Sequence, residues 1–548
     1  MFKLFLLIFK SPIVAIELLT SSAFLNFFSL SSSIFVILVL NRYVTYGLDG
    51  TLITLTIGVI IAVLLEFVLR RLRFRFSQKA VFDEKSKYSK LVFSKLISMQ
   101  ERVLISLHKS TKRKIIYDAD RADKFLSPEN INTILDAPFA ILFIFVIYLI
   151  NPEMALIVFL LCVIYFILGI FWSFYASSND LNINKTQSDR DDLIKNALSS
   201  KEIINIFGVG KKLLSQWKNL NDNLYKQTQL KLDRVNLIQS SIRLYSALVT
   251  IIVISWGAKL VVDGEINIGV LIGINILAAR STIPVLSFAY IFKKVKNFKA
   301  DVKSLNSFLN IPNDTHGNLE LKNFKGSVAL SKVNYEYLGS NQLTIENLSF
   351  EISSGDVLII KGQNGSGKTT LAKIISGINA PTSGSVLIDG INLRQIDFEW
   401  WSSQIIYMPE STSFFNGSIL ENFNIYQSNI SIQKVRECLV SVGLGSIAEE
   451  TNQGINMELH DNGNNLSIGI RRRLALARAL ASDGQVIIFD EPTENLDIES
   501  KQKVYALLNR FVKSNKTIIC FSQDPEIVKA ASYVIDLDQG GQLKKVKM

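Results

Sequence analysis

The chain has 548 residues, of which 48% are hydrophobic and 20% charged, and its formal net charge is +11. This length is too great for a single hydrophobic core and corresponds to roughly three domains. Its three cysteines, Cys162, Cys438 and Cys520, show neither disulfide nor metal-site spacing, which excludes a cysteine-based framework and leaves them as expected core residues.

Hydropathy divides the chain into two parts. About the first 300 residues carry long apolar stretches with few charges, whereas the remainder alternates short apolar runs with polar turns, as a soluble α/β domain does. The mean hydropathy of +0.27 therefore averages over two different environments.

An apolar run near the N-terminus looks like the core of a signal peptide. Lys10 and Pro12 interrupt it early, and no small-residue cleavage site follows, so an interfacial helix is the better interpretation. The expected division of the chain is this interfacial helix at residues 1–20, a membrane domain at 21–296, a linker at 297–325 and a soluble domain at 326–548.

Six apolar stretches have about the length that a bilayer requires. They cover about residues 21–40, 51–69, 138–150 with a few flanking residues, 154–175, 244–262 and 268–292. We therefore expect a membrane α-helical bundle of six transmembrane helices, with both ends of the chain on one side of the membrane.

Basic residues cluster after the second, fourth and sixth of these spans, and the other connections are short and nearly neutral or acidic. By the positive-inside rule, the basic loops and the soluble domain lie in the cytoplasm. This distribution explains the net charge without a nucleic-acid partner, and none is expected. The basic residues are Arg70, Arg71, Arg73 and Arg75, then Lys185 and Lys195, then Lys293, Lys294, Lys296 and Lys299.

Arg280 lies well inside the sixth apolar stretch and is followed by Pro284. A charge within a span is costly and often faces a polar cavity. Arg280 on the export pathway is therefore one hypothesis. The alternative is a structural pair with a carboxylate or a backbone carbonyl near a helix kink, and the sequence leaves both interpretations open.

The run from Gly362 to Thr370 fits the phosphate-binding pattern GxxxxGK[ST] in full, between a predicted strand and a predicted helix. Backbone amides at a helix N-terminus favour anions, Lys368 is expected to reach the β and γ phosphates, and the Thr369 hydroxyl to ligate Mg²⁺. The expected phosphate-binding residues are Gly362, Asn364, Gly365, Ser366, Gly367, Lys368, Thr369 and Thr370.

Two carboxylates, Asp490 and Glu491, end a hydrophobic strand about 120 residues after the phosphate loop. An aspartate there can hold Mg²⁺ through water, and the next carboxylate can orient or deprotonate an attacking water. The alternative is an acidic turn without catalytic function.

The order of these segments, with Leu466-Ser467-Ile468-Gly469-Ile470 between them, resembles the ABC transporter superfamily, and specifically its exporter-type half-transporters. The resemblance covers essentially the whole chain. It implies six membrane helices followed by a C-terminal α/β P-loop nucleotide-binding domain, ATP and Mg²⁺ as cofactors, and ATP hydrolysis coupled to transport.

Several residues match the family's motifs. Tyr337 matches the aromatic residue that stacks on adenine, although an ordinary strand tyrosine is the alternative. By the same resemblance, Asp490 is the Mg²⁺ aspartate, Glu491 the catalytic carboxylate, and Asp497 the key acidic residue of the dimer-contact loop.

Other positions depart from the family pattern. The LSGGQ segment retains Ser467 and Gly469 as nucleotide contacts but has Ile468 in place of a glycine, and this β-branched residue restricts close backbone approach. Glu410 replaces the glutamine that senses Mg²⁺; it can still ligate a hard cation but adds negative charge beside the phosphates. Gln523 replaces the switch histidine and can donate to the γ-phosphate without becoming a cation.

These departures affect which partner chain can complete the nucleotide sites. In ABC dimers each ATP lies between one chain's phosphate loop and the other chain's LSGGQ segment, so a symmetric homodimer carries every departure in both sites. A heterodimer with an intact partner would complete the site built on Lys368 and Glu491. The sequence therefore predicts ATP binding and leaves open the turnover of a homodimer.

The membrane half resembles the permease/ATPase of bacterial type I secretion systems, through Asn41-Arg42, Asp136-Ala137-Pro138, Gly264, Gly269 and Arg280 to Pro284. Asn41 departs from the family's usual aspartate. The resemblance implies a multi-pass protein of the bacterial inner membrane, a polypeptide substrate, a periplasmic adaptor and an outer-membrane channel. About twenty residues precede the first span, so no peptidase-like domain is expected there.

Two alternatives remain: a catalytically weak, regulatory half of a heterodimer, and a lipid or small-molecule exporter that shares every ATPase residue. In each case we expect two cytoplasmic segments, Asp118 to Ser127 and Ser200 to Lys212, to dock on the ATPase domain.

Overall fold

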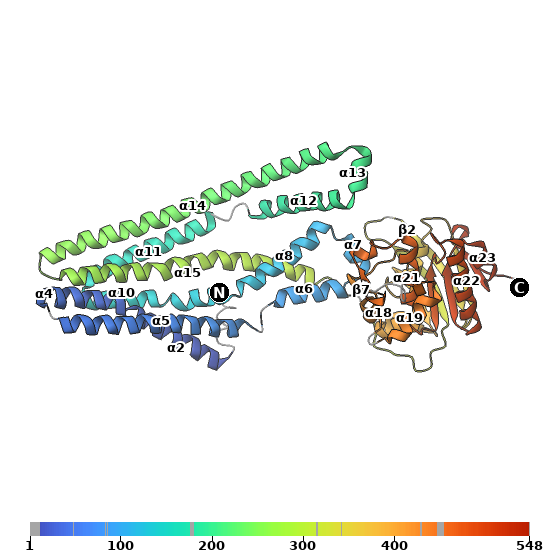
Figure 1. Cartoon of the computed structure of the whole chain (residues 1–548), viewed down its shortest axis with the longest axis horizontal. Helices are drawn as coiled ribbons and strands as arrows, with labels where there is room; N and C mark the ends of the chain where they lie inside the picture. The colour runs from blue at the N-terminus through green and yellow to red at the C-terminus, as the bar shows by residue number, and fades with distance from the viewer. Residues whose placement is uncertain are drawn as a thin grey trace. The chain divides into compact units, whose positions relative to one another are not determined.

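The computed structural model describes residues 11–47, 49–82, 84, 86–175, 180–313, 316–340, 342–427, 430–446 and 454–546. The chain folds into two compact units (Figure 1). The helical unit runs to Lys95 and resumes from Lys109 to Ile311, and the α/β unit combines Leu96–His108 with the chain from Pro312 onward. Residues 1–10 of the interfacial helix expected at residues 1–20 lie outside the described residues, and Pro12 to Thr20 form the start of a helix that continues to Ser29.

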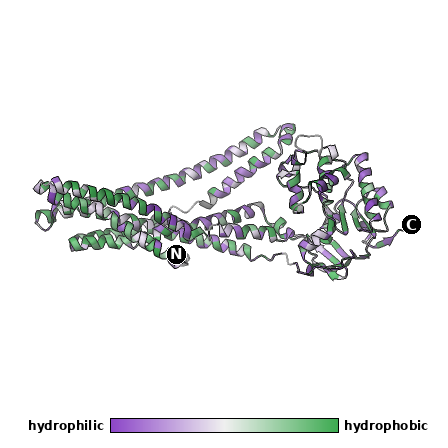
Figure 2. Cartoon of the chain, turned by 60° about the horizontal axis from the view of Figure 1, so that its bottom comes forward, coloured by the Kyte–Doolittle hydropathy of each residue, from purple (hydrophilic) through white to green (hydrophobic). Residues whose placement is uncertain are grey.

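The described part of the helical unit contains six helical segments that are long and apolar enough to cross a membrane, which confirms the predicted membrane bundle. In Figure 2, apolar residues gather at one end of this unit, whereas α12 and the adjoining part of α14 are largely hydrophilic. Its elements are α2 (Pro12–Ser29), α3 (Ser31–Leu38), a π-helical turn (Val39–Tyr43), α4 (Val44–Tyr46), α5 (Asp49–Phe82), α6 (Lys87–Ser98), α8 (Lys109–Phe125), α9 (Pro128–Asp136), α10 (Phe139–Ile150), α11 (Pro152–Tyr175), α12 (Asp180–Ser199), α13 (Lys201–Phe207), α14 (Gly210–Val262) and α15 (Ile268–Leu309).

Two glycines let α15 approach the first span closely. A Cβ at Gly269 would lie 2.4 Å from the Asn41 side-chain oxygen, and a Cβ at Gly273 would lie 2.3 Å from Cγ1 of Ile37. Small residues spaced four apart permit this approach between membrane helices. α15 continues to Leu309, so residues 297–309, expected within the linker, are helical.

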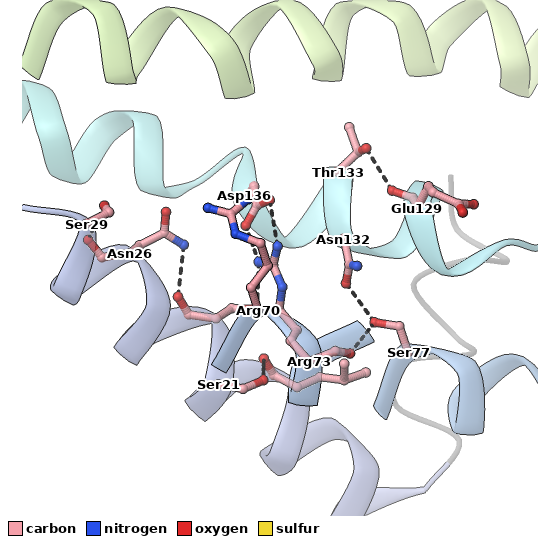
Figure 3. Close-up of polar contacts among 12 residues, drawn as sticks. Ser21, Asn26, Ser29, Arg70, Arg73, Ser77, Glu129, Asn132, Thr133 and Asp136 are labelled. Carbon is pink, nitrogen blue, oxygen red and sulfur yellow. Dashed lines mark hydrogen bonds and ion pairs between the residues drawn. The ribbon is translucent and has the colours of Figure 1, made fainter. Parts of the chain in front are cut away.

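A buried ion pair joins α5 to α9 (Figure 3). Arg73 is 5% exposed and pairs with Asp136, with 3.2 Å between Nη2 and Oδ2. One turn further along α5, the Ser77 hydroxyl donates to the Asn132 side-chain oxygen at 2.6 Å. Arg73, one of the basic residues that follow the second span, is thus an internal structural cation.

Arg280 has a neutral partner on another helix. Its Nη2 donates to the Ser32 hydroxyl of α3 at 2.9 Å, and its side chain is partly buried. The partner is thus a hydroxyl and not the carboxylate or backbone carbonyl of the structural interpretation, and the place of Arg280 on an export pathway stays a prediction.

The docking of Asp118 to Ser127 on the ATPase domain stays a prediction. This segment belongs to the helical unit, where Arg121 of α8 forms ion pairs with Asp118 and with Asp301 of α15. The segment that belongs to the α/β unit is residues 96–108, which contain α7 (Glu101–Ser106). The docking of Ser200 to Lys212 stays a prediction.

A six-stranded sheet, ordered β12-β11-β3-β10-β9-β6, forms the centre of the α/β unit. β9 and β10 are buried at every residue, as expected for parallel strands covered on both faces. Alternate residues enter opposite cores: Ile488 packs on one side of the sheet and Phe489 on the other. The strands are β3 (Val357–Lys361), β6 (Ile405–Met408), β9 (Val486–Asp490), β10 (Thr517–Phe521), β11 (Tyr533–Asp536) and β12 (Leu543–Lys545).

A second, antiparallel sheet has the order β2-β1-β4-β5, and a short pair joins β7 to β8. The cysteine prediction is confirmed, since all three cysteines are free and buried. The remaining strands are β1 (Val328–Glu336), β2 (Leu343–Ile352), β4 (Ser383–Ile388), β5 (Ile391–Asn392), β7 (Gly417–Ser418) and β8 (Glu458–Leu459). The helices are α16 (Lys368–Ile375), α17 (Phe398–Gln404), α18 (Ile419–Tyr426), α19 (Ile432–Ser441), α21 (Ile468–Ala479), α22 (Ile498–Lys513) and α23 (Pro525–Lys529).

Candidate nucleotide-binding and catalytic site

Three neighbouring strands end at one edge of the six-stranded sheet, and each is followed by predicted site residues. The phosphate loop follows β3, Glu491 follows β9, and Gln523 follows β10. Because these strands are parallel neighbours in the order β3-β10-β9, their carboxyl ends bring the three segments together.

The phosphate loop has the backbone that its glycines permit. Gly365 and Gly367 have φ angles of +90° and +95°, in the left-handed region that other residues rarely adopt. A Cβ at Gly362 would lie 2.4 Å from the Ser366 hydroxyl. The loop leads directly into α16, which begins at Lys368, so its amides and the helix N-terminus face the same space.

Lys368 is held inside this loop. Its side chain is 8% exposed, and Nζ donates to the carbonyls of Gly362 at 2.6 Å and Gln363 at 3.3 Å. The same Nζ lies 3.5 Å from Oε1 of Glu491. The lysine charge is therefore available to phosphate oxygens and also faces the candidate catalytic carboxylate.

Asp490 is fully buried, and neither of its carboxylate oxygens has a hydrogen-bond partner among the described residues. Burial, aided by the charges of Glu410 and Glu491, raises its pKa to about 6. Two unpartnered oxygens in this position suit a hard cation such as Mg²⁺, which prefers oxygen ligands. The Thr369 hydroxyl is nearby and donates to Oε2 of Glu410 at 2.6 Å.

Glu491 adopts a left-handed backbone conformation, with φ of +49°. Its amide donates to the Phe521 carbonyl at 2.9 Å, which fixes it against the end of β10. Burial raises the pKa of its carboxyl group, and the Lys368 ammonium opposes that rise. A carboxylate with a raised pKa is better suited to accept a proton from water.

Tyr337 precedes the phosphate loop in the sequence and Gln523 follows it, and both residues contact the loop. Gln523 Nε2 donates to the Gly362 carbonyl, so the residue at the switch position already faces the loop. The Tyr337 hydroxyl lies 2.9 Å from the Thr370 hydroxyl, and its ring packs edge to face on Tyr335 at 5.1 Å. Tyr337 is thus placed beside the loop, where an adenine-stacking role remains a proposal.

Ser467, Gly469 and Asp497 are placed differently. Ser467 caps α21 by accepting from the Ile470 amide, and Asp497 caps α22 by accepting from the Ser500 amide at 2.9 Å. Hydrogen bonds from Ser500 lower the pKa of Asp497. In the described part of the chain, no hydrogen bond joins these residues to the phosphate loop, and the neighbouring Ile468 side chain is 60% exposed.

Sequence reasoning missed two charged residues near the site. Arg472 of α21 is 5% exposed and donates to the Glu491 carbonyl. Lys373 of α16 forms an ion pair of 2.9 Å with Glu101 of α7, so the segment 96–108 contacts the helix that begins with Lys368. The helical spacing that places Arg472 on the inner face of α21 was available in the sequence, but the partner of Lys373 was not.

Two family descriptions match this chain. Residues 15–283 match the ABC transporter transmembrane region, and residues 345–494 match ABC transporter. Together they cover most of both units.

Curated relatives match along almost the full chain. The alpha-hemolysin translocation ATP-binding protein HlyB of Escherichia coli O157:H7 is 28% identical over 542 residues, covering 96% of this chain and 75% of the relative. The leukotoxin export ATP-binding protein LtxB of Aggregatibacter actinomycetemcomitans is 26% identical, covering 97% and 76%. Among solved structures, a bacterial Atm1-family ABC exporter with ATP bound superimposes with a TM-score of 0.82 at 17% identity, covering 97% of this chain and 95% of the other.

Proposed function

Because this chain belongs to the ABC transporter family, with the transmembrane region and the ATP-binding domain in one polypeptide, we propose that it exports a polypeptide across the bacterial inner membrane. It is an ATP-driven exporter, and its ATP hydrolysis is coupled to transport. Exporters of this type function as dimers, and the chain is a membrane protein with a nucleotide-binding domain.

The polypeptide substrate is supported by one observation above all. Relatives named for translocation or export of alpha-hemolysin and leukotoxin align with 96% to 97% of this chain. Partners that span the periplasm and the outer membrane belong to the same proposal.

Each residue of the site would have a separate role in binding or hydrolysing ATP. Lys368 and the loop amides would bind the phosphates, and Thr369, Asp490 and Glu410 would hold Mg²⁺, which would neutralise phosphate charge when bound. Glu491 would orient water and accept its proton, and Gln523 would donate to the γ-phosphate.

A heterodimer is favoured as an alternative by the exposed Ile468 side chain. Its 60% exposure places it on the surface at the start of α21, where the family pattern has a glycine that contacts the partner's nucleotide. Such a chain would weaken the partner's site while its own site, built on Lys368 and Glu491, is completed by the partner.

A lipid or small-molecule substrate is favoured by a separate observation. An open apolar groove of about 700 Å³ is lined by residues of α10, α11 and α15, among them Ile141, Phe159, Phe166 and Phe288, and Ile141 and Phe159 are 70% and 50% exposed. Its size is within the range of small-ligand pockets.

ATP turnover of the purified chain in lipid vesicles tests these proposals, with Glu491→Gln as the inactive comparison. We expect wild-type turnover to rise on addition of a reduced, carboxymethylated polypeptide and the variant to bind ATP without turnover. Stimulation by a lipid or small amphiphile alone would overturn the polypeptide substrate. Equal inactivity of both proteins with intact ATP binding would favour the heterodimer.

A further inference from the structure

Arg472 lies on the first turn and a half of α21, on the buried side of that helix. Its side chain is only 6% exposed, although it stands in a run of three arginines. The preceding Arg471 instead bonds the Asn464 side chain at 2.6 Å on the surface. A buried guanidinium is retained only where specific acceptors compensate for its lost hydration.

The acceptors of Arg472 all lie in the segment that follows β9. Nη2 donates to the Glu491 carbonyl, and Nη1 lies 3.3 Å from Oε2 of Glu494. The remaining Nε–H is buried without a partner among the described residues. Arg472 therefore bonds to the backbone of the candidate catalytic residue and to the side chain of Glu494 in the same segment.

The backbone conformation of Glu491 has to be held by neighbouring contacts. Glu491 has a φ of +49°, which is uncommon for a residue with a Cβ and persists only when neighbouring contacts fix it. Its amide is fixed by the Phe521 carbonyl at 2.9 Å, and its carbonyl accepts from the Glu494 amide at 3.3 Å and from Arg472. Phe521 belongs to β10, the neighbouring strand of the same sheet, whereas Arg472 comes from a helix, α21.

The helix that carries Arg472 begins at the segment with Ser467 as its cap. A shift of α21 would move the guanidinium and, through it, the Glu491 carbonyl. We propose that Arg472 is a positioning residue that sets the backbone of Glu491 according to the position of α21. This rests on the proposed function, in which Ser467 and Gly469 contact a nucleotide held by the partner chain.

The consequence is a link between two sites of a dimer. Nucleotide contact at the start of α21 concerns the partner's site, whereas Glu491 belongs to this chain's own site. Arg472 links nucleotide contact at the start of α21 to the position of Glu491 through its two acceptors, the Glu491 carbonyl and the Glu494 carboxylate.

Hydrogen exchange of the full chain in lipid nanodiscs tests this proposal without requiring turnover. Arg472→Gln keeps a donor but removes the charge and one branch of the fork, and Arg471→Gln is the matched control. We expect amides between Glu491 and Glu494 to exchange at least tenfold faster in Arg472→Gln and to be unchanged in Arg471→Gln. We also expect ATP binding to protect this segment in wild type but not in Arg472→Gln.

Steady-state ATP hydrolysis separates positioning from a general structural role. Arg472→Gln should lower kcat at least tenfold while KM for ATP changes less than twofold, and Arg472→Lys should give an intermediate kcat. If Arg472→Gln fails to fold, Glu494→Gln serves as the second variant, since it removes the negative charge of one acceptor; exchange at Glu491 should then rise by about threefold.

Unchanged exchange at Glu491 to Glu494 in folded Arg472→Gln would overturn the proposal, as would equal losses in Arg471→Gln. Failure of the wild-type chain to bind ATP would instead defeat the proposed function, and it would be seen in the binding measurement before any comparison of variants.

Discussion

The Thr369 hydroxyl donates to Oε2 of Glu410 at 2.6 Å, which joins the first turn of α16 to the segment that follows β6. The side chain expected to ligate Mg²⁺ is therefore engaged by a carboxylate where the family pattern has an amide. This carboxylate also contributes to the raised pKa of Asp490.

Glu410→Gln should tighten ATP binding in the absence of Mg²⁺. Removing one negative charge beside the phosphates should gain about 1 kcal/mol, or roughly fivefold in Kd, at the effective dielectric constant of a partly exposed site. Calorimetric titration with a chelator present measures this. Glu399→Gln, on the exposed side of α17, is the control and should leave Kd unchanged; a weaker Kd in Glu410→Gln would contradict the repulsion.

Asp490→Asn should stabilise the nucleotide-free chain in a pH-dependent way. The pKa of this carboxyl group rises from 3.8 to about 6 on folding. Between these values the unfolded chain has released the proton and the folded chain retains it, so wild type loses stability as the pH rises through this window. The ionised carboxylate then costs about 3 kcal/mol above pH 6.

Thermal unfolding of wild type and Asp490→Asn in detergent with a chelator, from pH 4 to pH 8, checks this prediction. The gain in the variant should be absent near pH 4 and complete above pH 6. A gain that is equal at both ends would mean that burial of the charge is not its cause.

Asp136→Asn should destabilise the helical unit by about 3 kcal/mol, because it leaves the buried Arg73 without its counter-charge. The double replacement Arg73→Met with Asp136→Leu should recover to within about 1 kcal/mol of wild type, since neither buried charge remains. The Arg190–Asp191 pair on the hydrophilic α12, where the Asp191 side chain is 52% exposed, supplies the control: Asp191→Asn should cost less than about 0.5 kcal/mol. Denaturant midpoints in detergent measure all three, and equal effects of Asp136→Asn and Asp191→Asn would refute the prediction.

Glu101→Lys should weaken the response of ATP turnover to a polypeptide substrate. It replaces the ion pair with Lys373 by a repulsion between α7 and α16, the helix that begins with Lys368. We expect at least a threefold loss of stimulation, and restoration by the exchanged pair Glu101→Lys with Lys373→Glu. Lack of restoration in the double variant would show that the ion pair does not act in this response.

Local sequence patterns were sufficient to predict much of the site. The phosphate loop from Gly362 to Thr370 is recognisable because its glycines meet local backbone requirements that involve only residues a few positions away. The six spans are recognisable because a bilayer imposes a length and a composition that no tertiary contact alters. Asp490 at the end of a buried strand belongs to the same class of signal.

The sequence was insufficient where a residue's partner is distant along the chain. Arg73 belongs to a cluster of basic residues in the sequence, but its position on α5 places it against Asp136, 63 residues later. Asp118 to Ser127 is amphipathic, and within the helical unit Arg121 of this segment pairs with Asp301 of α15. An amphipathic helix shows that a face is buried without showing what buries it.

The sequence by itself determined the family, the division into membrane and nucleotide-binding parts, and the residue types available to ATP and Mg²⁺, because these depend on composition and short spacings. Only the tertiary structure decided that residues 96–108 belong with the α/β unit, that Glu410 engages Thr369, and that Arg472 reaches the Glu491 carbonyl. Each of these depends on chain segments that fold together over long separations, and no local pattern specifies which distant group a buried charge will meet.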